Sequence, residues 1–127
     1  MKKIKERTFL IVDDEPDIFW AMEHLLKQKG FVLIRALNGM ETLVSMKKKH
    51  FELILLDAKL PDIEGLALAK KIKKMDSMVP IVLISGYFSR DDEIVQDALS
   101  SGLICGYISK PFQHTEILNT VKNLGLL

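Results

Sequence analysis

Four short runs of apolar residues are the clearest pattern along the chain. They cover residues 9–12, 53–56 and 81–84, with a weaker run over 103–108. None of them alternates with polar residues, which is typical of strands that are buried on both faces in a parallel sheet. A less regular apolar stretch over residues 32–36 predicts a fifth strand.

Segments with apolar residues at helical spacing separate these runs. They cover residues 16–29, 40–48, 64–75, 91–101 and 113–124. Strand and helix therefore alternate five times along the chain. This order predicts an α/β fold, in which right-handed crossovers connect the strands of a doubly wound parallel sheet.

Residues at the expected helix boundaries agree with this order. Asp14 is placed to cap a first helix that has Pro16 in its first turn, and Gly30 and Gly102 lie where helices should stop. Trp20 has apolar neighbours in the first helix, which favours packing at the edge of the core over a place on a docking surface.

The length of 127 residues suits one domain, and we expect residues 1–7 to form a short N-terminal tail. A net charge of +1 and a charged fraction of 28% give no reason to expect a nucleic acid or membrane partner. The lysines fall in separate segments among acids, which favours solvated helix faces. The single cysteine, Cys105, excludes an internal disulfide, and no segment has the length of a membrane span, so a reducing cytoplasm is the expected location.

Polar residues with reactive side chains follow four of the predicted strands. Asp13 and Asp14 follow the first strand, Asp57 the third, Ser85 the fourth and Lys110 the fifth. In an open α/β sheet, ligands bind beyond the carboxyl ends of the strands. These five side chains are therefore expected to converge at one edge of the sheet.

The chemistry of this set suggests phosphoryl transfer. Three carboxylates repel one another unless a hard cation lies among them, and an all-oxygen set suits Mg²⁺. A phosphoryl group in transfer needs its oxygen charge neutralised, which Mg²⁺, the Lys110 ammonium and the Ser85 hydroxyl would supply while a carboxylate attacks.

In this respect the chain resembles the receiver domains of two-component response regulators, over nearly its whole length. The similar segments are Val12-Asp13-Asp14-Glu15, the stretch from Leu56 to Gly65 with its Pro61 and Gly65 turn, Ser85-Gly86, and the stretch from Tyr107 to Phe112 with its Lys110-Pro111 pair. Phe19 to Met22 and Lys59 to Asp62 are most similar to regulators of the nitrogen-regulation type. The stretch from Ser85 to Lys110 is longer than usual for the family, which leaves the placement of the fourth helix open.

The resemblance implies a flavodoxin-like, CheY-like sheet of order 2-1-3-4-5 with five helices. It also implies that Asp57 accepts a phosphoryl group from a sensor histidine kinase or a histidine phosphotransfer protein. Asp14, Asp57 and the main-chain carbonyl of Lys59 would hold Mg²⁺, for which Mn²⁺ substitutes, and Asp13 would bind it through water. The Lys110-Pro111 bond would be cis.

The resemblance further implies a signalling domain rather than an enzyme with a separate substrate, since it would catalyse only its own phosphorylation and dephosphorylation. Ser85 and Tyr107 would act as the switch. They would signal through the fourth helix, fifth strand and fifth helix to an output domain, a partner protein or a second copy of the chain. The sequence leaves open which kinase and output are involved, and whether the domain works alone or within a longer regulator.

Three alternative functions fit the residues less well. A phosphatase of the haloacid dehalogenase type would carry its nucleophile after the first strand and its acid pair late, the reverse of the order here. A flavodoxin-like binding module needs a phosphate loop where Asp13 and Asp14 would repel the ligand. A receiver-like domain that is not phosphorylated would lack the acceptor, the acid pair or the lysine, and all of these are present.

Overall fold

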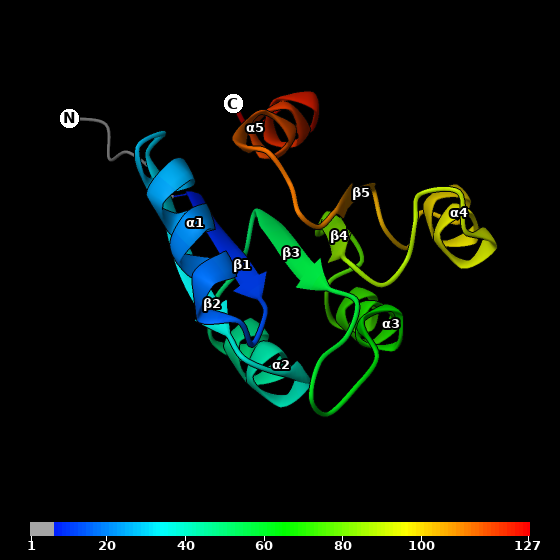
Figure 1. Cartoon of the computed structure of the whole chain (residues 1–127). Coiled ribbons are helices and arrows are strands. Elements are labelled where there is room, and N and C mark those ends of the chain that lie inside the picture. Colours follow the sequence, from blue (N-terminus) through cyan, green and yellow to red (C-terminus); the bar gives the residue numbers. More distant parts are fainter. Residues whose placement is uncertain (1–6) are drawn as a thin grey trace.

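The computed structural model describes residues 7–127, in which five strands and five helices alternate (Figure 1). The elements are β1 (Arg7–Val12), α1 (Pro16–Lys27), β2 (Phe31–Ala36), α2 (Gly39–Lys48), β3 (Leu53–Asp57), α3 (Gly65–Met75), β4 (Ile81–Ser85), α4 (Glu93–Ser100), β5 (Gly106–Ser109) and α5 (His114–Asn123). Arg7 already belongs to β1, so the tail expected over residues 1–7 is one residue too long, and the rest of it lies outside the described residues.

The strands form one parallel sheet in the order β2-β1-β3-β4-β5, which confirms the predicted topology. The register aligns the carboxyl ends of the strands. Val12 pairs with Ala36 and Leu56, and Asp57 pairs with Ile84. The side chains that follow β1, β3, β4 and β5 are thus brought to the same edge of the sheet.

Two buried clusters cover the two faces of the sheet. The first packs α2, α3 and α4 against one face, and its helical members include Leu68, Ile72 and Val95. The second packs α1 and α5 against the other, with Met22 and Val121 among its members. Because the central strands are buried on both faces, they need uninterrupted apolar runs, and this is the pattern from which they were predicted.

Several element boundaries differ from the prediction by one to three residues, and two of these differences have a clear physical reason. β5 begins at Gly106 rather than at residue 103, although Ile104 is buried. Its apolar side chain fills the core from the loop before the strand. α4 begins at Glu93 rather than at residue 91, because the Asp92 carboxylate accepts hydrogen bonds from the amide and hydroxyl of Ser89 and closes a turn there.

Two predictions about α1 are wrong. Asp14 does not cap the helix, since Glu15 is the N-cap residue and makes no side-chain capping bond. The Asp13 carboxylate accepts the Glu15 amide instead, at 2.9 Å. Trp20 does not close the core either: its side chain is 65% exposed and stacks on the ring of His24.

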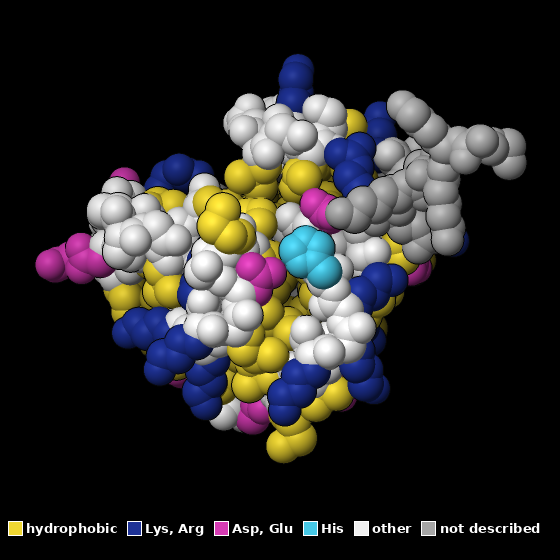
Figure 2. All heavy atoms as spheres, turned by 180° about the vertical axis from the view of Figure 1, so that it is seen from behind, with side chains coloured by type: hydrophobic (Ala, Val, Ile, Leu, Met, Phe, Trp, Pro, Cys, Tyr) yellow, Lys and Arg dark blue, Asp and Glu magenta, His cyan; other side chains and the backbone are white. Residues whose placement is uncertain are grey.

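On the face drawn in Figure 2, charged side chains are distributed rather than gathered into one field. Figure 2 shows lysine and arginine side chains scattered around a strip of apolar side chains, with acidic side chains between them. The lysines at 47–49, 70, 71 and 74 are exposed, as expected for solvated helix faces. Within residues 7–127, no helix is long and apolar enough to cross a bilayer.

Candidate functional site

Three acidic side chains meet at the carboxyl ends of β1 and β3. Carboxylate oxygens of Asp13, Asp14 and Asp57 all lie within 4.8 Å of one another, so one cation can contact them together. Asp13 and Asp57 are buried, whereas Asp14 is exposed. A small set of oxygen ligands with one side open to solvent fits Mg²⁺, which retains several of its waters, and the same donors suit Mn²⁺.

Lys110, which follows the edge strand β5, contacts this acidic group. Its Nζ lies 3.0 Å from Asp13 Oδ2, 3.5 Å from Asp57 Oδ2 and 3.3 Å from Glu15 Oε1. Glu15 was not expected in the site, although its position directly after the acid pair suggests such a contact. Lys110 thus balances the two buried carboxylates and holds an exposed third one at the rim.

Burial and mutual repulsion perturb the titration of these groups. Burial raises the pKa of Asp57 above its ordinary value and the Asp13 carboxylate raises it further, against the opposing effect of Lys110. Burial also raises the pKa of Asp13, although the Glu15 amide and Lys110 oppose it. For Lys110, burial lowers the pKa but the neighbouring carboxylates outweigh it, so the net pKa is raised. The lysine is therefore charged wherever the carboxylates are.

Replacing Asp57 by asparagine is expected to raise the melting temperature of the metal-free protein by a few degrees at neutral pH. A carboxylate whose folded pKa is raised destabilises the fold where it is ionised. This cost is absent below its unfolded pKa and complete above its folded pKa. The advantage of Asp57→Asn should therefore shrink as the pH falls through the folded pKa of Asp57.

Thermal melts in EDTA from neutral pH to about pH 4 test this expectation. The exposed Asp91 lies outside the acidic group, and Asp91→Asn serves as the matched control, which should leave the melting temperature unchanged. A metal-free Asp57→Asn protein that melts below the parent would show that Lys110 already neutralises the buried pair completely.

Ser85, the last residue of β4, is buried, and its hydroxyl is engaged with the loop that follows. Ser85 Oγ accepts hydrogen bonds from the amides of Tyr87 at 2.8 Å and Phe88 at 3.1 Å. If the Ser85 hydroxyl moves to donate a hydrogen bond to a group at Asp57, these two bonds to the loop change. Any movement of the hydroxyl towards Asp57 therefore involves the loop from Gly86 to Asp92.

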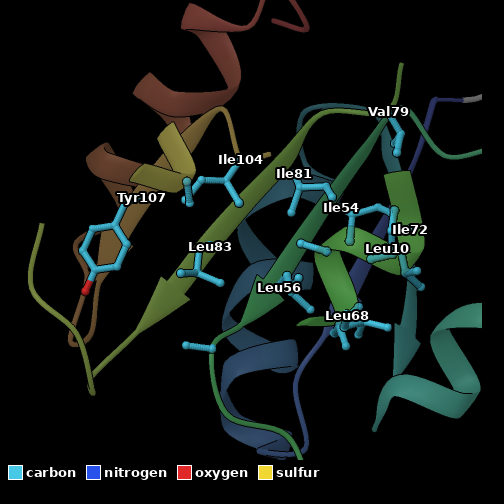
Figure 3. Close-up of a cluster of buried hydrophobic side chains, with 14 of the residues drawn as sticks. Leu10, Ile54, Leu56, Leu68, Ile72, Val79, Ile81, Leu83, Ile104 and Tyr107 are labelled. Atoms are coloured by element: carbon cyan, nitrogen blue, oxygen red, sulfur yellow. The ribbon is translucent and has the colours of Figure 1, made fainter. Parts of the chain in front are cut away.

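The same loop is attached to β5 by two further contacts. The Tyr107 ring is 3% exposed, and its hydroxyl donates to the main-chain oxygens of Phe88 and Ser85. Figure 3 shows this ring at the margin of the first core cluster, with its oxygen turned away from the apolar side chains. Arg90 Nη2 donates to the main-chain oxygen of Tyr107 at 2.8 Å. Ser85 and Tyr107 thus contact the same loop after β4, and the Tyr107 ring is already buried.

The residues expected to shape the site have distinct positions. The Lys110-Pro111 bond is cis, as expected. The Gly65 amide donates to the Ala58 main-chain oxygen at 2.7 Å. A Cβ at Gly65 would lie 2.4 Å from the main-chain oxygen of Asp57. Pro61 is exposed in the loop between β3 and α3. Lys59 lies in the same loop, with its amide 3.3 Å from Asp57 Oδ1, and the metal-binding role of its carbonyl stays a prediction.

Comparison with known families and sequences gives one consistent result. The family model for the response regulator receiver domain matches residues 9–122. The transcriptional regulatory protein PrrA of Mycobacterium tuberculosis is 32% identical over 118 residues, which are 91% of this chain and 48% of PrrA. Sporulation initiation phosphotransferase F of Bacillus subtilis is 29% identical, and 89% of each chain is aligned. The DNA-binding transcriptional regulator NtrC of Salmonella typhimurium is 30% identical over 88% of this chain and 23% of its own. This chain therefore spans about half the length of PrrA, but most of the length of phosphotransferase F.

Solved structures agree with the sequence comparisons. A CheY-like response regulator receiver domain protein from Methanospirillum hungatei superposes with a TM-score of 0.84, at 30% identity and with 95% of each chain covered. The response regulator TrrA of Thermotoga maritima, solved in complex with Mg²⁺ and BeF, gives a TM-score of 0.79 at 31% identity, with 93% of this chain and 98% of TrrA covered.

Proposed function

Since this chain belongs to the family of response regulator receiver domains, we propose that it accepts a phosphoryl group on Asp57 in a Mg²⁺-dependent reaction. The observation that carries this proposal is the position of Asp57, buried at the end of β3 within reach of two further carboxylates and Lys110. Such a site supplies a nucleophile, a set of cation ligands and a fixed positive charge.

Each residue has a role in the proposed reaction. An Asp57 carboxylate oxygen attacks the phosphorus, the bond from phosphorus to the donor's leaving atom breaks, and the leaving group keeps that electron pair. Mg²⁺ held by Asp14, Asp57 and the Lys59 carbonyl, with Asp13 binding through water, would offset charge on the phosphoryl oxygens. Lys110 balances the remaining charge, and Ser85 donates its hydroxyl hydrogen to a phosphoryl oxygen.

The proposed phosphodonor is a phosphohistidine on a sensor histidine kinase or a histidine phosphotransfer protein. The similarity to a phosphotransferase of B. subtilis and to transcriptional regulators supports a place in a phosphorelay. The proposed recipient of the signal is an output domain or partner protein, or a second copy of the chain. Bound nucleic acid or membrane is not part of the proposal, and the reaction is confined to the domain's own aspartate.

A small phosphodonor such as acetyl phosphate, with Mg²⁺, is expected to add one phosphoryl group to the protein. Lys110 and the carboxylates that can hold the cation already lie beside Asp57, so no kinase is needed to supply them. Intact-mass measurement detects the adduct directly. The proposed function is wrong if the adduct persists in Asp57→Asn or forms equally well in EDTA, and a parent protein that forms none is a receiver fold without phosphorylation.

The output surface is proposed to be the face of α4, β5 and α5. Ser85 and Tyr107 both bind the loop that leads into α4, so a hydroxyl drawn towards the phosphoryl group changes that loop's contacts with β5. A shift between two surface arrangements of similar energy would follow, with a coupling free energy of about 1 to 3 kcal/mol.

Adding beryllofluoride and Mg²⁺, which mimic the aspartyl phosphate, is expected to shift the amide NMR signals of α4 and β5 as well as those of the loops around Asp57. The physical reason is that Arg90 and Tyr107 join the loop to β5. The middle of α2, which lies away from this path, serves as the internal reference. Shifts confined to the loops around Asp57 would place the output surface elsewhere.

A further inference from the structure

Asp62 connects the loop after Asp57 to a helix that is distant in the sequence. Its Oδ1 accepts a hydrogen bond from the Gly39 amide at 2.8 Å, and its Oδ2 accepts one from the Met40 amide at 3.1 Å. Both amides belong to the first turn of α2, where main-chain donors have no partner within the helix. Asp62 thus joins the loop from Ala58 to Glu64 to the N-terminus of α2.

These bonds are not the ordinary cap of α2, which is already present. Asn38 is the N-cap residue, and its Oδ1 accepts the Glu41 amide at 2.8 Å. The close approach of the loop is also built into the chain at Gly39, where a Cβ would lie 2.5 Å from Ile63 Cγ2. The Asp62 carboxylate is therefore an additional acceptor at this helix end, and it also ties the loop to the helix.

The loop from Ala58 to Glu64 is closed at its base and held at its tip. At the base, Lys59 and Glu64 form an antiparallel bridge, and the Gly65 amide donates to the Ala58 oxygen. The tip is joined to α2 by Asp62. Hydrogen bonding from the Gly39 amide lowers the pKa of Asp62, so this side chain is ionised and accepts both bonds at neutral pH.

We infer that Asp62 is a positioning residue, which holds this loop in the shape that presents the Lys59 main-chain carbonyl to a cation beside Asp57. The inference deepens the proposed function and rests on it. Asp62 neither touches the cation nor replaces any of its ligands. It restricts the freedom of the segment that contributes the neutral ligand, and such supporting contacts typically change metal affinity by about 10- to 100-fold.

The test compares two variants that each remove a cap from the same helix end. Asp62→Ala releases the loop as well as the helix, whereas Asn38→Ala affects only the helix. Mg²⁺ binding to the metal-free proteins is measured by calorimetry, together with amide hydrogen exchange in the loop. Asp62→Ala is expected to weaken Mg²⁺ binding about tenfold and to speed exchange at Lys59, whereas Asn38→Ala should change neither by more than about twofold.

Two further measurements separate positioning from general destabilisation. Asp62→Asn keeps one acceptor oxygen and should fall between the parent and Asp62→Ala, and phosphorylation of every variant should recover at saturating Mg²⁺ if only the ligand's placement is disturbed. The inference is overturned if Asp62→Ala and Asn38→Ala, both folded by thermal melts, weaken Mg²⁺ binding equally or not at all. A parent protein that binds no Mg²⁺ overturns the proposed function itself, which distinguishes the two failures.

Discussion

Replacing Lys110 by alanine is expected to slow phosphorylation of Asp57 by a small phosphodonor about a hundredfold or more, while Mg²⁺ binds more tightly. The loss of rate follows because a positioned cation next to a developing phosphoryl charge contributes at least as much as one oxyanion-hole donor, about 10²- to 10³-fold. The gain in Mg²⁺ affinity follows because Lys110 lies 3.0 Å from Asp13 and 3.5 Å from Asp57 and competes electrostatically with a bound cation.

These opposite signs make the Lys110 experiment specific. A variant that is merely misfolded would lose both rate and Mg²⁺ affinity. Lys74→Ala is the matched control, because it removes the same charge from an exposed position on α3 and should change neither quantity. Rates come from intact-mass time courses at saturating Mg²⁺, and affinities from calorimetry. If Lys110→Ala phosphorylates at the parental rate, Lys110 is only a structural partner of the buried acids.

The strands could be predicted from the sequence because each satisfies one simple physical requirement. A central strand of a parallel sheet is covered by helices on both faces, so β1, β3 and β4 read as unbroken apolar runs. The start of the edge strand β5 could not be located in this way. Ile104 is apolar because it fills the core, yet it lies in the loop before the strand, and burial alone does not distinguish the two states.

The site could also be predicted in outline, because parallel topology brings strand ends together. Asp13, Asp57 and Lys110 meet as expected, although the last of them follows the first by 97 positions. The contact between Glu15 and Lys110 was missed, since three consecutive acids do not show which of them turns inwards. For the same reason the sequence assigned the N-cap of α1 to Asp14, whereas in the structure the Asp13 carboxylate accepts the Glu15 amide before that helix.

The exposure of Trp20 and the hydrogen bonds of Asp62 were not predicted from the sequence. Met22 and Leu26 are four positions apart and define the buried side of α1. Trp20 precedes Met22 by two positions, about 200° around the helix, and so faces solvent in spite of its apolar neighbours. The bonds from Asp62 to Gly39 and Met40 cross between distant segments, and no local pattern marks such a pair.

Replacing Gly65 by alanine is expected to destabilise the protein by about 3 kcal/mol, at the upper end of the usual cost of overpacking. The added Cβ would lie 2.4 Å from the main-chain oxygen of Asp57 and 2.7 Å from the Ala58 Cα. Both are backbone atoms, so no flexible side chain can move aside. Either α3 moves away from the sheet, or the end of β3 moves and takes Asp57 from its position beside Lys110.

Gly86→Ala is the matched control, since it adds the same methyl group next to the same site. The nearest atom to a Cβ at Gly86 is the Lys110 Cβ at 3.6 Å, which is an ordinary van der Waals contact. The φ of Gly86 is not in the left-handed region. Its stability should therefore stay within about 0.5 kcal/mol of the parent or rise slightly, because the unfolded chain loses freedom. Chemical denaturation of both variants in EDTA measures the difference. Equal stability of Gly65→Ala and Gly86→Ala would mean that the start of α3 yields without cost, and that Asp57 does not depend on this close approach.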